Sequence, residues 1–253
     1  MTKRYVRIKT PQGQIHYGLL SIDRTVQTLD APPWKGGQPT ELVLTEAQYQ
    51  FLAPCAPSKI IAVGKNYAKH AEEMGGSVPA EPLLFLKPPT AITAHQGEIL
   101  YPNLSQQVDY EGELAIVMGE RTYQCEGEEA YSKIWGYTIA NDVTARDLQK
   151  TDGQWTRAKG FDSFCPLGPW IVTEINPGAL LQTFLNDQIV QSASISDMVF
   201  APHILVAYIS QVMTLLPGDV ILTGTPAGIG PMQRGDHVRI AIEGIGSLEN
   251  TVV

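Results

Sequence analysis

Apolar and polar residues alternate in short segments along most of this chain, the pattern typical of β-strands that bury one face. Near the N-terminus, Val6 and Ile8 share one side of a predicted strand, and Ile15 and Leu19 repeat this spacing after a Pro-Gln-Gly turn. We therefore expect residues 5 to 30 to form a short antiparallel meander.

Two proline-containing stretches separate this meander from the rest of the chain. Residues 31 to 39 have the composition of a loop, and residues 51 to 58 have that of a linker. We place a domain boundary at Ser58. Residues 1–58 are then a small N-terminal β module with its linker, and residues 59–253 are a larger domain that carries all the candidate chemistry.

The larger domain is also predicted to be rich in strands. Its one longer helix is predicted at residues 202 to 215, and shorter helical segments at residues 67 to 74 and within the polar stretch 121 to 133. The predicted strands are residues 59–63, 82–87, 108–117, 134–140, 170–172, 180–185, 188–190, 220–222 and 238–242. The fold class is therefore mainly β with short helices (α+β).

Composition excludes several classes of function. With 253 residues, 43% of them hydrophobic, the chain can bury a sizeable core, and its formal charge of −8 argues against nucleic acid or anionic membranes as partners. Its three cysteines lie far apart without a Cys-x-x-Cys pair, so we expect neither a disulfide framework nor a zinc site. The N-terminal segment has no apolar core of a signal peptide, and no run of eighteen apolar residues occurs. We expect a cytoplasmic protein.

Acidic residues are concentrated in the strand predicted at residues 108 to 117. Because side chains of a strand alternate between its faces, Glu111 and Glu113 project from the same face, with Asp109 beside them. Two carboxylates thus converge at one end of the strand. The alternative is an edge strand with a solvated acidic face.

A third acid follows the next predicted strand. Asp142, Arg146 and Gln149 have the i, i+4, i+7 spacing of one face of a short helix. Asp142 and the two glutamates would offer three carboxylates, which suit Mg2+ or Mn2+ better than zinc. Arg146 and Gln149 would then face a substrate. The alternative for Asp142 is a simple helix N-cap.

A possible general base lies in the short helix at residues 67 to 74. His70 and Glu73 are three residues apart, so the carboxylate can orient the imidazole. The alternative is a solvated polar face. Lys87 lies at the end of the strand predicted at residues 82–87. It could line a site, but a solvated side chain is the preferred interpretation.

Two ordered motifs carry a family resemblance. Asp-Tyr-Glu-Gly-Glu-Leu at residues 109–114 and Asn-Asp-Val-Thr-Ala-Arg-Asp-Leu-Gln at residues 141–149 resemble the fumarylacetoacetate hydrolase family. Members of this family cleave carbon–carbon bonds beside a carbonyl or isomerise related keto acids. The resemblance implies a core of mixed sheets arranged as a β roll, and a homodimer.

Three further motifs assign expected roles through this resemblance. The segment with His70 and Glu73 resembles a mobile lid in which the pair activates or positions water. Ala-Lys-Gly-Phe-Asp supplies Lys159 as the active-site lysine, and the second threonine of Thr-Gly-Thr-Pro, Thr225, is expected to contact a substrate carboxylate. From pattern alone, Lys159 could equally be solvated and the Thr225 loop could be a glycine-rich turn.

These observations predict a Mg2+- or Mn2+-dependent enzyme that acts on small α-keto acids. It would hydrolyse a carbon–carbon bond of acylpyruvates such as fumarylpyruvate, or decarboxylate oxaloacetate, through a stabilised enolate. The alternatives are an isomerase or tautomerase of a keto–enol dicarboxylate, and a non-catalytic protein that has only inherited the fold.

Overall fold

A computed structural model of the chain describes residues 2–253. Its N-terminal module is an antiparallel meander of β1 (Arg4–Lys9), β2 (Ile15–Leu20), β3 (Val26–Leu29) and β4 (Pro39–Leu44), with β5 (Gln50–Leu52) also paired to β1. The antiparallel pairing of β1 with β2 and of β2 with β3 confirms the predicted meander. Two 3-10 turns, η1 (Pro33–Lys35) and η2 (Glu46–Gln48), lie in its loops.

The module continues into the main sheet of the protein, because Tyr5 of β1 pairs with Ile171 of β14. From β14 the sheet runs in the spatial order β14 (Cys165–Val172), β12 (Ile134–Asn141), β11 (Gly112–Met118), β17 (Val220–Leu222), β6 (Ile60–Gly64) and β7 (Leu83–Lys87). The short strand β8 (Ile92–Thr93) also pairs with β14. The central strand β11 is buried along its whole length.

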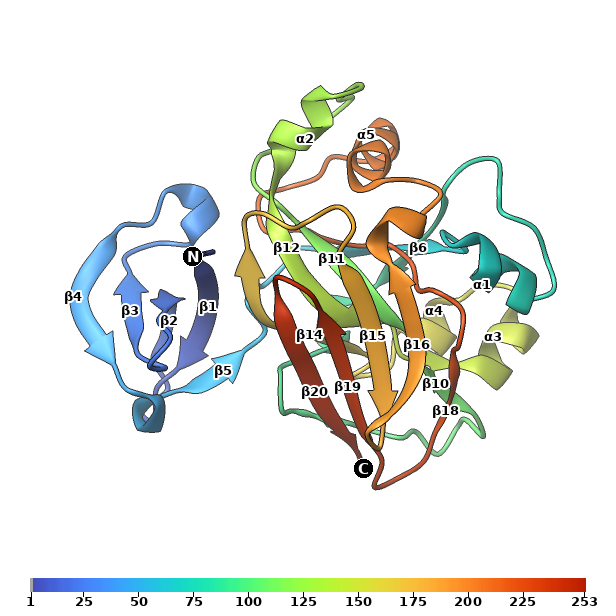
Figure 1. Cartoon of the computed structure of the whole chain (residues 1–253), viewed down its shortest axis with the longest axis horizontal. Coiled ribbons are helices and arrows are strands. Elements are labelled where there is room, and N and C mark those ends of the chain that lie inside the picture. Colours follow the sequence, from blue (N-terminus) through green and yellow to red (C-terminus); the bar gives the residue numbers. More distant parts are fainter. Residues whose placement is uncertain (1) are drawn as a thin grey trace.

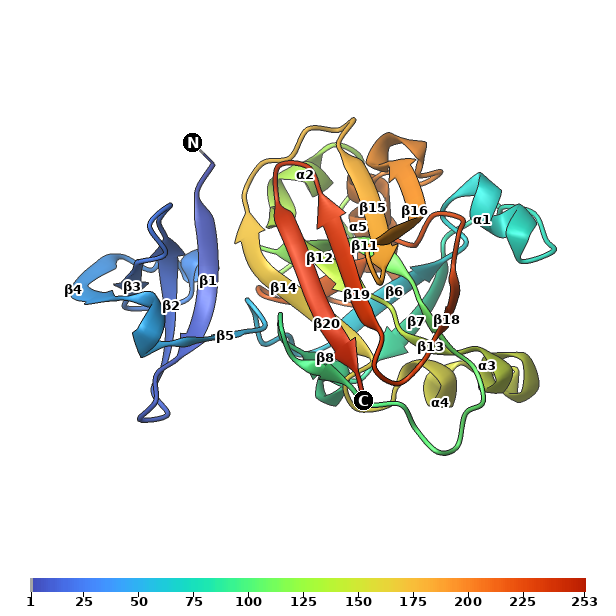
Figure 2. The same ribbon diagram turned by 60° about the horizontal axis from the view of Figure 1, so that its bottom comes forward.

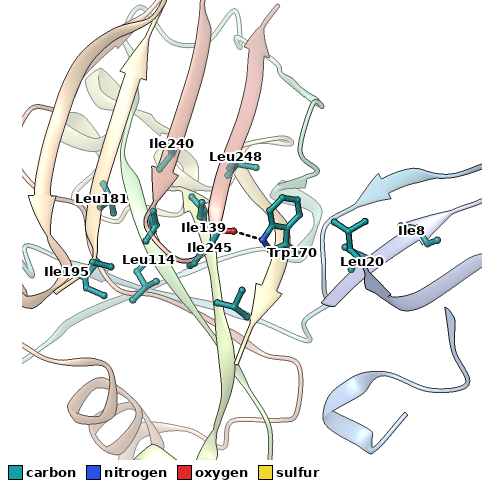
Figure 3. Packing of buried hydrophobic residues seen from close by; sticks show 14 of the residues in the cluster. Ile8, Leu20, Leu114, Ile139, Trp170, Leu181, Ile195, Ile240, Ile245 and Leu248 are labelled. Carbon is teal, nitrogen blue, oxygen red and sulfur yellow. Dashed lines mark hydrogen bonds between the residues drawn. The ribbon is translucent and has the colours of Figure 1, made fainter. Parts of the chain in front are cut away.

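A second sheet covers one face of the main sheet. Its order is β16 (Gln188–Ser194), β15 (Leu180–Leu185), β19 (His237–Ile242), β20 (Gly246–Val252) and β9 (Glu98–Ile99). Between the sheets, apolar side chains of β11 and β12 pack with those of β15, β19 and β20, as Figure 3 shows. The indole nitrogen of Trp170 donates a hydrogen bond to the Ile245 carbonyl at 2.6 Å, which satisfies the one polar atom of this large side chain.

The same face of the main sheet is also covered by α5 (Pro202–Val212), whose Leu205 and Ile209 pack with Ile116 and Ile221 of β11 and β17. Leu114 and Ile116 are two residues apart on β11 and share this face, whereas Ala115 and Val117 point to the opposite face and enter a third apolar cluster. Burying each large side chain contributes about 1.5–3 kcal/mol. The remaining 3-10 turns are η3 (Pro89–Ala91) and η4 (Ile195–Asp197), and α2 (Glu129–Lys133) is a single helical turn before β12.

A small third sheet and three short helices build the end of the molecule that is farthest from the N-terminal module. The sheet has the order β13 (Thr144–Ala145), β10 (Val108–Tyr110), β18 (Gly230–Met232), and the helices are α1 (Ala68–Glu73), α3 (Arg146–Asp152) and α4 (Thr156–Lys159). Figures 1 and 2 show α1 and α3 at this end of the long axis, opposite the blue strands. All candidate site residues lie on or beside these elements.

The predicted fold class is confirmed: strands dominate and the helices are short. Two local predictions differ from the structure. The stretch 121 to 133 is helical only in α2, and β20 was not predicted because its sequence, Gly-Ser-Leu-Glu-Asn-Thr-Val, is largely polar. No helix within residues 2–253 is both long and apolar enough to cross a membrane.

Candidate metal centre and its cavity

Three acidic side chains meet where β11 and β12 end. Glu111 is the single residue that connects β10 and β11, Glu113 lies on β11, and Asp142 directly follows β12. The Asp142 amide donates to the Glu111 carbonyl at 2.9 Å, and the Glu111 amide donates to Asn141 Oδ1 at 2.8 Å. These bonds fix the two chain segments side by side, so that one carboxylate oxygen of each acid lies within 4.8 Å of the others.

This position of Asp142 corrects the sequence interpretation. The structure begins α3 at Arg146, so Asp142 lies in the connection after β12 and not on a helical face. The i, i+4 spacing between these two residues is coincidental. Asp142 is nevertheless brought to the glutamates by strand pairing, because Gly112 of β11 pairs with Asn141 of β12.

Buried cations surround the acids. Lys159 Nζ lies 2.9 Å from Glu111 Oε2 and 2.6 Å from Asp142 Oδ2. Arg146 forms an ion pair with Glu111 and another, at 2.8 Å, with Asp109. Lys159 and Arg146 are only 2% and 3% exposed, so the alternative of a solvated Lys159 is wrong.

For a further cation, Lys87, the preferred interpretation of a solvated side chain is wrong. Lys87 ends β7 and is 1% exposed, with Nζ 2.6 Å from Asp142 Oδ1 and 3.2 Å from the Val143 carbonyl. It holds one oxygen of Asp142 while Lys159 holds the other. The local sequence gave no sign of this contact, because β7 and Asp142 are 55 residues apart along the chain.

The buried charges do not balance. Four carboxylates are buried together, and only three cations accompany them; the carboxylates are Asp109, Glu111, Glu113 and Asp142, and the cations are Lys87, Arg146 and Lys159. With every group ionised, one negative charge is left over. Among residues 2–253, Glu113 has no ion-pair partner and accepts only the amide of Gly224, at 2.7 Å, so the surplus is centred there.

The pKa shifts reflect this distribution. Burial, together with the neighbouring charges of Asp142 and Glu111, raises the pKa of Glu113 well above its usual value. Burial acts in the same direction on Glu111, but Lys159 and Arg146 outweigh it and lower the pKa of that carboxyl. Burial alone would lower the pKa of Lys159, and the carboxylates of Asp142 and Glu111 more than offset it, so its pKa is raised.

The triad fits a divalent cation. It offers three hard oxygen donors without sulfur or imidazole nitrogen among them, which is the donor set preferred by Mg2+ and Mn2+. A cation at Glu113 would also compensate the unpaired charge, whose burial is otherwise costly. The acidic cluster could therefore bind a metal ion.

The triad borders a cavity of about 200 Å3. This volume is below the ~300–1,000 Å3 of pockets that hold drug-sized ligands, so the cavity suits a small molecule. Its lining combines charged and apolar side chains: Val63, Gly64, Lys65, His70, Met74, Phe85, Glu111, Glu113, Asp142, Arg146, Gln149, Lys150, Trp155, Lys159 and Thr225.

Of the remaining candidate residues, His70, Arg146, Gln149 and Thr225 line this cavity, and Glu73 contacts it through His70. His70 Nδ1 lies 3.1 Å from Glu73 Oε2, so the predicted pair forms, and His70 is buried instead of solvated. The other oxygen of Glu73 accepts the Gly228 amide at 3.0 Å, which ties α1 to the loop after β17. Gln149 Oε1 accepts from Arg146 at 2.6 Å.

Thr225 has a hydrogen-bond arrangement that the sequence did not predict. Its hydroxyl donates to the Gly112 carbonyl at 2.9 Å and accepts from Gln191 Nε2 at 2.9 Å. The hydroxyl proton is therefore already used within the protein. Gln191, which was not a candidate, fixes the loop by also donating to the Pro226 carbonyl at 2.8 Å.

The fold and site define a class: a mostly β protein with a small cavity and a buried carboxylate triad that could hold a divalent metal ion. Residues 59–253 match the sequence profile of the fumarylacetoacetate (FAA) hydrolase C-terminal domain, and residues 3–54 match a profile described as Rv2993c-like, N-terminal. The chain belongs to the fumarylacetoacetate hydrolase family. Members of this family are enzymes that act on small keto acids.

Relatives with several activities resemble the chain. A crystal structure of 2-hydroxyhepta-2,4-diene-1,7-dioate isomerase from Mycobacterium marinum is 44% identical, with a TM-score of 0.92 over 99% of this chain and 98% of that one. The mitochondrial oxaloacetate tautomerase FAHD2A of Bos taurus is 41% identical over 83% of this chain and 72% of its own length. Fumarylpyruvate hydrolase from Pseudomonas aeruginosa, solved in complex with Mn2+ and pyruvate, is 32% identical, with a TM-score of 0.75 over 81% of this chain and 91% of that one.

The first prediction concerns the unpaired carboxylate. Glu113→Gln should weaken Mg2+ or Mn2+ binding by at least about a hundredfold, since even outer-shell partners of metal ligands contribute 10- to 100-fold. The fold should survive, because the raised pKa of Glu113 means that a neutral group is tolerated there. Calorimetric titration with each metal would measure this, with the exposed Glu120→Gln as the control. Unchanged affinity in Glu113→Gln would remove the metal site.

The second prediction concerns Lys87. Lys87→Met should lower the free energy of unfolding by about 3–5 kcal/mol in a metal-free buffer, because it leaves the buried Asp142 carboxylate short of a partner. Denaturant unfolding would measure the change. Lys133→Met is the matched control, since the carboxylate partners of Lys133 are largely exposed and little change is expected. Equal effects in both variants would show that the buried Lys87–Asp142 ion pair stabilises the fold no more than the exposed pairs of Lys133 do.

Proposed function

We propose that this protein is a Mg2+- or Mn2+-dependent enzyme that converts small α-keto acids through an enolate. One observation carries the proposal: His70, which is hydrogen-bonded to Glu73, borders the same small cavity as Lys159 and the carboxylate triad. A base, a fixed cation and a metal-binding set are the components that formation of an enolate needs.

The proposed metal ligands are Glu111, Glu113 and Asp142. A divalent ion held there would supply Lewis-acid polarisation of the carbonyl next to the substrate carboxylate. Lys159 would provide a fixed positive charge near the oxygen on which the enolate charge develops. In a site from which water is excluded, one such interaction contributes several kcal/mol to the transition state.

His70 would be the group that moves protons. Its Nδ1 faces Glu73 Oε2, which leaves Nε2 as the nitrogen that exchanges a proton with water or substrate. Glu73 is a positioning residue in this scheme, because its carboxylate holds the ring while its second oxygen binds the Gly228 amide. The base would thus be held on a helix that is itself tied to the cavity wall.

For an acylpyruvate, the preferred reaction is hydrolysis of the carbon–carbon bond. Water loses a proton to His70 and its oxygen bonds to the distal carbonyl carbon. The bond from this carbon to the methylene group then breaks, and its electron pair becomes the enolate of pyruvate. Return of a proton to the methylene carbon gives pyruvate and the second carboxylic acid. With oxaloacetate, loss of CO2 gives the same enolate without attack by water.

Arg146, Gln149 and Thr225 are proposed to hold the rest of the substrate. Arg146 and Gln149 are hydrogen-bonded to each other at 2.6 Å and would present a joint polar surface. Thr225 already donates to the Gly112 carbonyl, so a bond from its hydroxyl to a substrate carboxylate requires this proton to change partner.

A second candidate is tautomerisation or isomerisation of a keto–enol dicarboxylate. The similarity to the Bos taurus oxaloacetate tautomerase and to the Mycobacterium marinum isomerase favours it. The same residues would move a proton between carbon and oxygen without breaking a carbon–carbon bond.

Three further predictions remain untested: the protein forms a homodimer, it is located in the cytoplasm, and its domain boundary lies at Ser58.

The third prediction separates these reactions. With Mg2+ present, fumarylpyruvate and acetylpyruvate should lose their enol absorbance and release pyruvate, and oxaloacetate should release CO2. His70→Ala should abolish hydrolysis and spare metal affinity, with the exposed Glu72→Gln as a control from the same helix. Product analysis that finds only keto–enol exchange would establish the second candidate. Metal binding without turnover of any of the three compounds would support a binding protein.

The fourth prediction concerns Lys159. Lys159→Met should lower kcat by about 100- to 1,000-fold, the usual effect of removing one group that stabilises a developing oxyanion. Steady-state kinetics with the substrate identified by the screen would measure it, and circular dichroism would verify the fold. Wild-type turnover in this variant would exclude the lysine from the chemistry.

A further inference from the structure

Two lysines that line the cavity have no role in the scheme above. Lys65 is half-buried and Lys150 is exposed, whereas Arg146 and Lys159 of the same lining are buried. We call the part of the lining formed by the more exposed Lys65 and Lys150 its open end. The part formed by the triad with the buried, paired Arg146 and Lys159 is its buried end. Within residues 2–253, neither Lys65 nor Lys150 has a hydrogen-bond or ion-pair partner for its ammonium group.

The backbone at Lys65 is held in an unusual conformation. Its φ of 57° lies in the left-handed region, which is unfavourable for a residue with a side chain. The next residue, Asn66, fixes this turn: its side-chain amide donates to the carbonyls of Phe200 at 3.0 Å and Thr223 at 2.7 Å. Its Oδ1 also accepts the Phe200 amide at 2.8 Å.

Such strain persists only where surrounding contacts over-determine it, and it is concentrated at functional sites. Here it holds Lys65 at the exit of β6, in the cavity lining. The ammonium group lies beside Gly76, since a methyl group at that position would lie 3.1 Å from Lys65 Nζ. The fold thus accommodates an otherwise unpaired lysine next to the end of α1.

Apolar side chains line the cavity together with these charged groups. Phe85 and Trp155 meet edge to face, with ring centroids 5.1 Å apart, and Lys159 Nζ lies 5.0 Å from the centroid of Phe85. Flat aromatic surfaces suit a planar, unsaturated carbon segment. The faces of these rings offer no partner for a negative charge, so an anionic group at the open end would be bound by the two lysines.

We infer that Lys65 and Lys150 bind a second anionic group of the substrate, and that they make the site selective for α-keto acids with a distal carboxylate. The inference rests on the proposed function for the orientation of the substrate, with its α-keto carboxylate at the triad. The inference adds Lys65 and Lys150 as specificity-determining residues that bind the end of the substrate farther from the triad.

Charge complementarity supports this orientation. With every group ionised, the buried end has one surplus negative charge, so it attracts an anion only when a metal ion is bound there. The open end is positive in either case. A dicarboxylate therefore meets favourable potential first at Lys65 and Lys150, and this contribution weakens with added salt because both groups are partly solvated.

The fifth prediction uses equilibrium binding, which requires no turnover. Two α-keto acids of equal carbon number, 2-oxoglutarate and 2-oxopentanoate, differ in having a distal carboxylate or a methyl group. In calorimetry with the Mn2+-loaded protein, 2-oxoglutarate should bind about tenfold more tightly or better. Lys65→Met and Lys150→Met should each lower its affinity about two- to fivefold, and the double variant should lose the discrimination.

Lys69→Met is the matched control, because Lys69 is an exposed lysine of α1 outside the cavity lining, and the discrimination should not change. Lys65→Arg should retain most of it, since the charge is kept. Equal affinities of the two acids in the wild type, or discrimination that persists in the double variant, would overturn the inference. The proposed function would fail separately, through absence of turnover in a protein that still discriminates between the two acids.

Discussion

The ion pairs of Lys159 with Glu111 and Asp142 are the interactions on which the arrangement of the site depends. A carboxylate or ammonium group taken out of water is very unfavourable unless it is paired, and no single segment of this chain could supply both signs. The acids come from the ends of β11 and β12, whereas the cations come from β7, α3 and α4. Folding must therefore bring five elements together before any of these charges is compensated, which explains why the site lies where the main sheet, the three-stranded sheet and the short helices meet.

The apolar sheet holds this polar cluster in place. Beyond Glu113, β11 is apolar on both faces: Leu114 and Ile116 face the second sheet and α5, and Ala115 and Val117 lie on the face that carries Glu113. A one-residue slip of β11 would exchange these faces and bury Glu113 among aliphatic side chains. Register is thus set by hydrophobic burial, and the geometry of the carboxylates follows from register. The hydrogen bonds between Glu111 and the segment at Asn141 and Asp142 then fix the ends of the two strands.

Contacts between residues close together in the sequence could be predicted, whereas contacts between distant segments could not. Alternation along β11 placed Glu111 and Glu113 together, and the three-residue spacing in α1 placed His70 beside Glu73, because both are local periodicities. Asp142 was assigned to the right site for the wrong local reason, since strand pairing, and not a helical face, brings it there. Lys87 was missed because its partner is 55 residues away, and a lysine at the end of a strand carries no local sign of burial. The hydroxyl bonds of Thr225 depend on Gln191, another distant residue.

The charge balance of the cluster links the metal, the substrate and the two outer lysines. With all groups ionised, the buried cluster has one surplus negative charge, so a divalent cation would change its sign and leave one positive charge. The carboxylate of an α-keto acid would then restore neutrality, and each ligand would favour binding of the other by compensating a buried charge. A second carboxylate would exceed this balance if it were bound at the same end. Among residues 2–253, the lysines and arginines of the cavity lining that have no ion-pair partner are Lys65 and Lys150, so these two would be left to bind the second charge of a substrate.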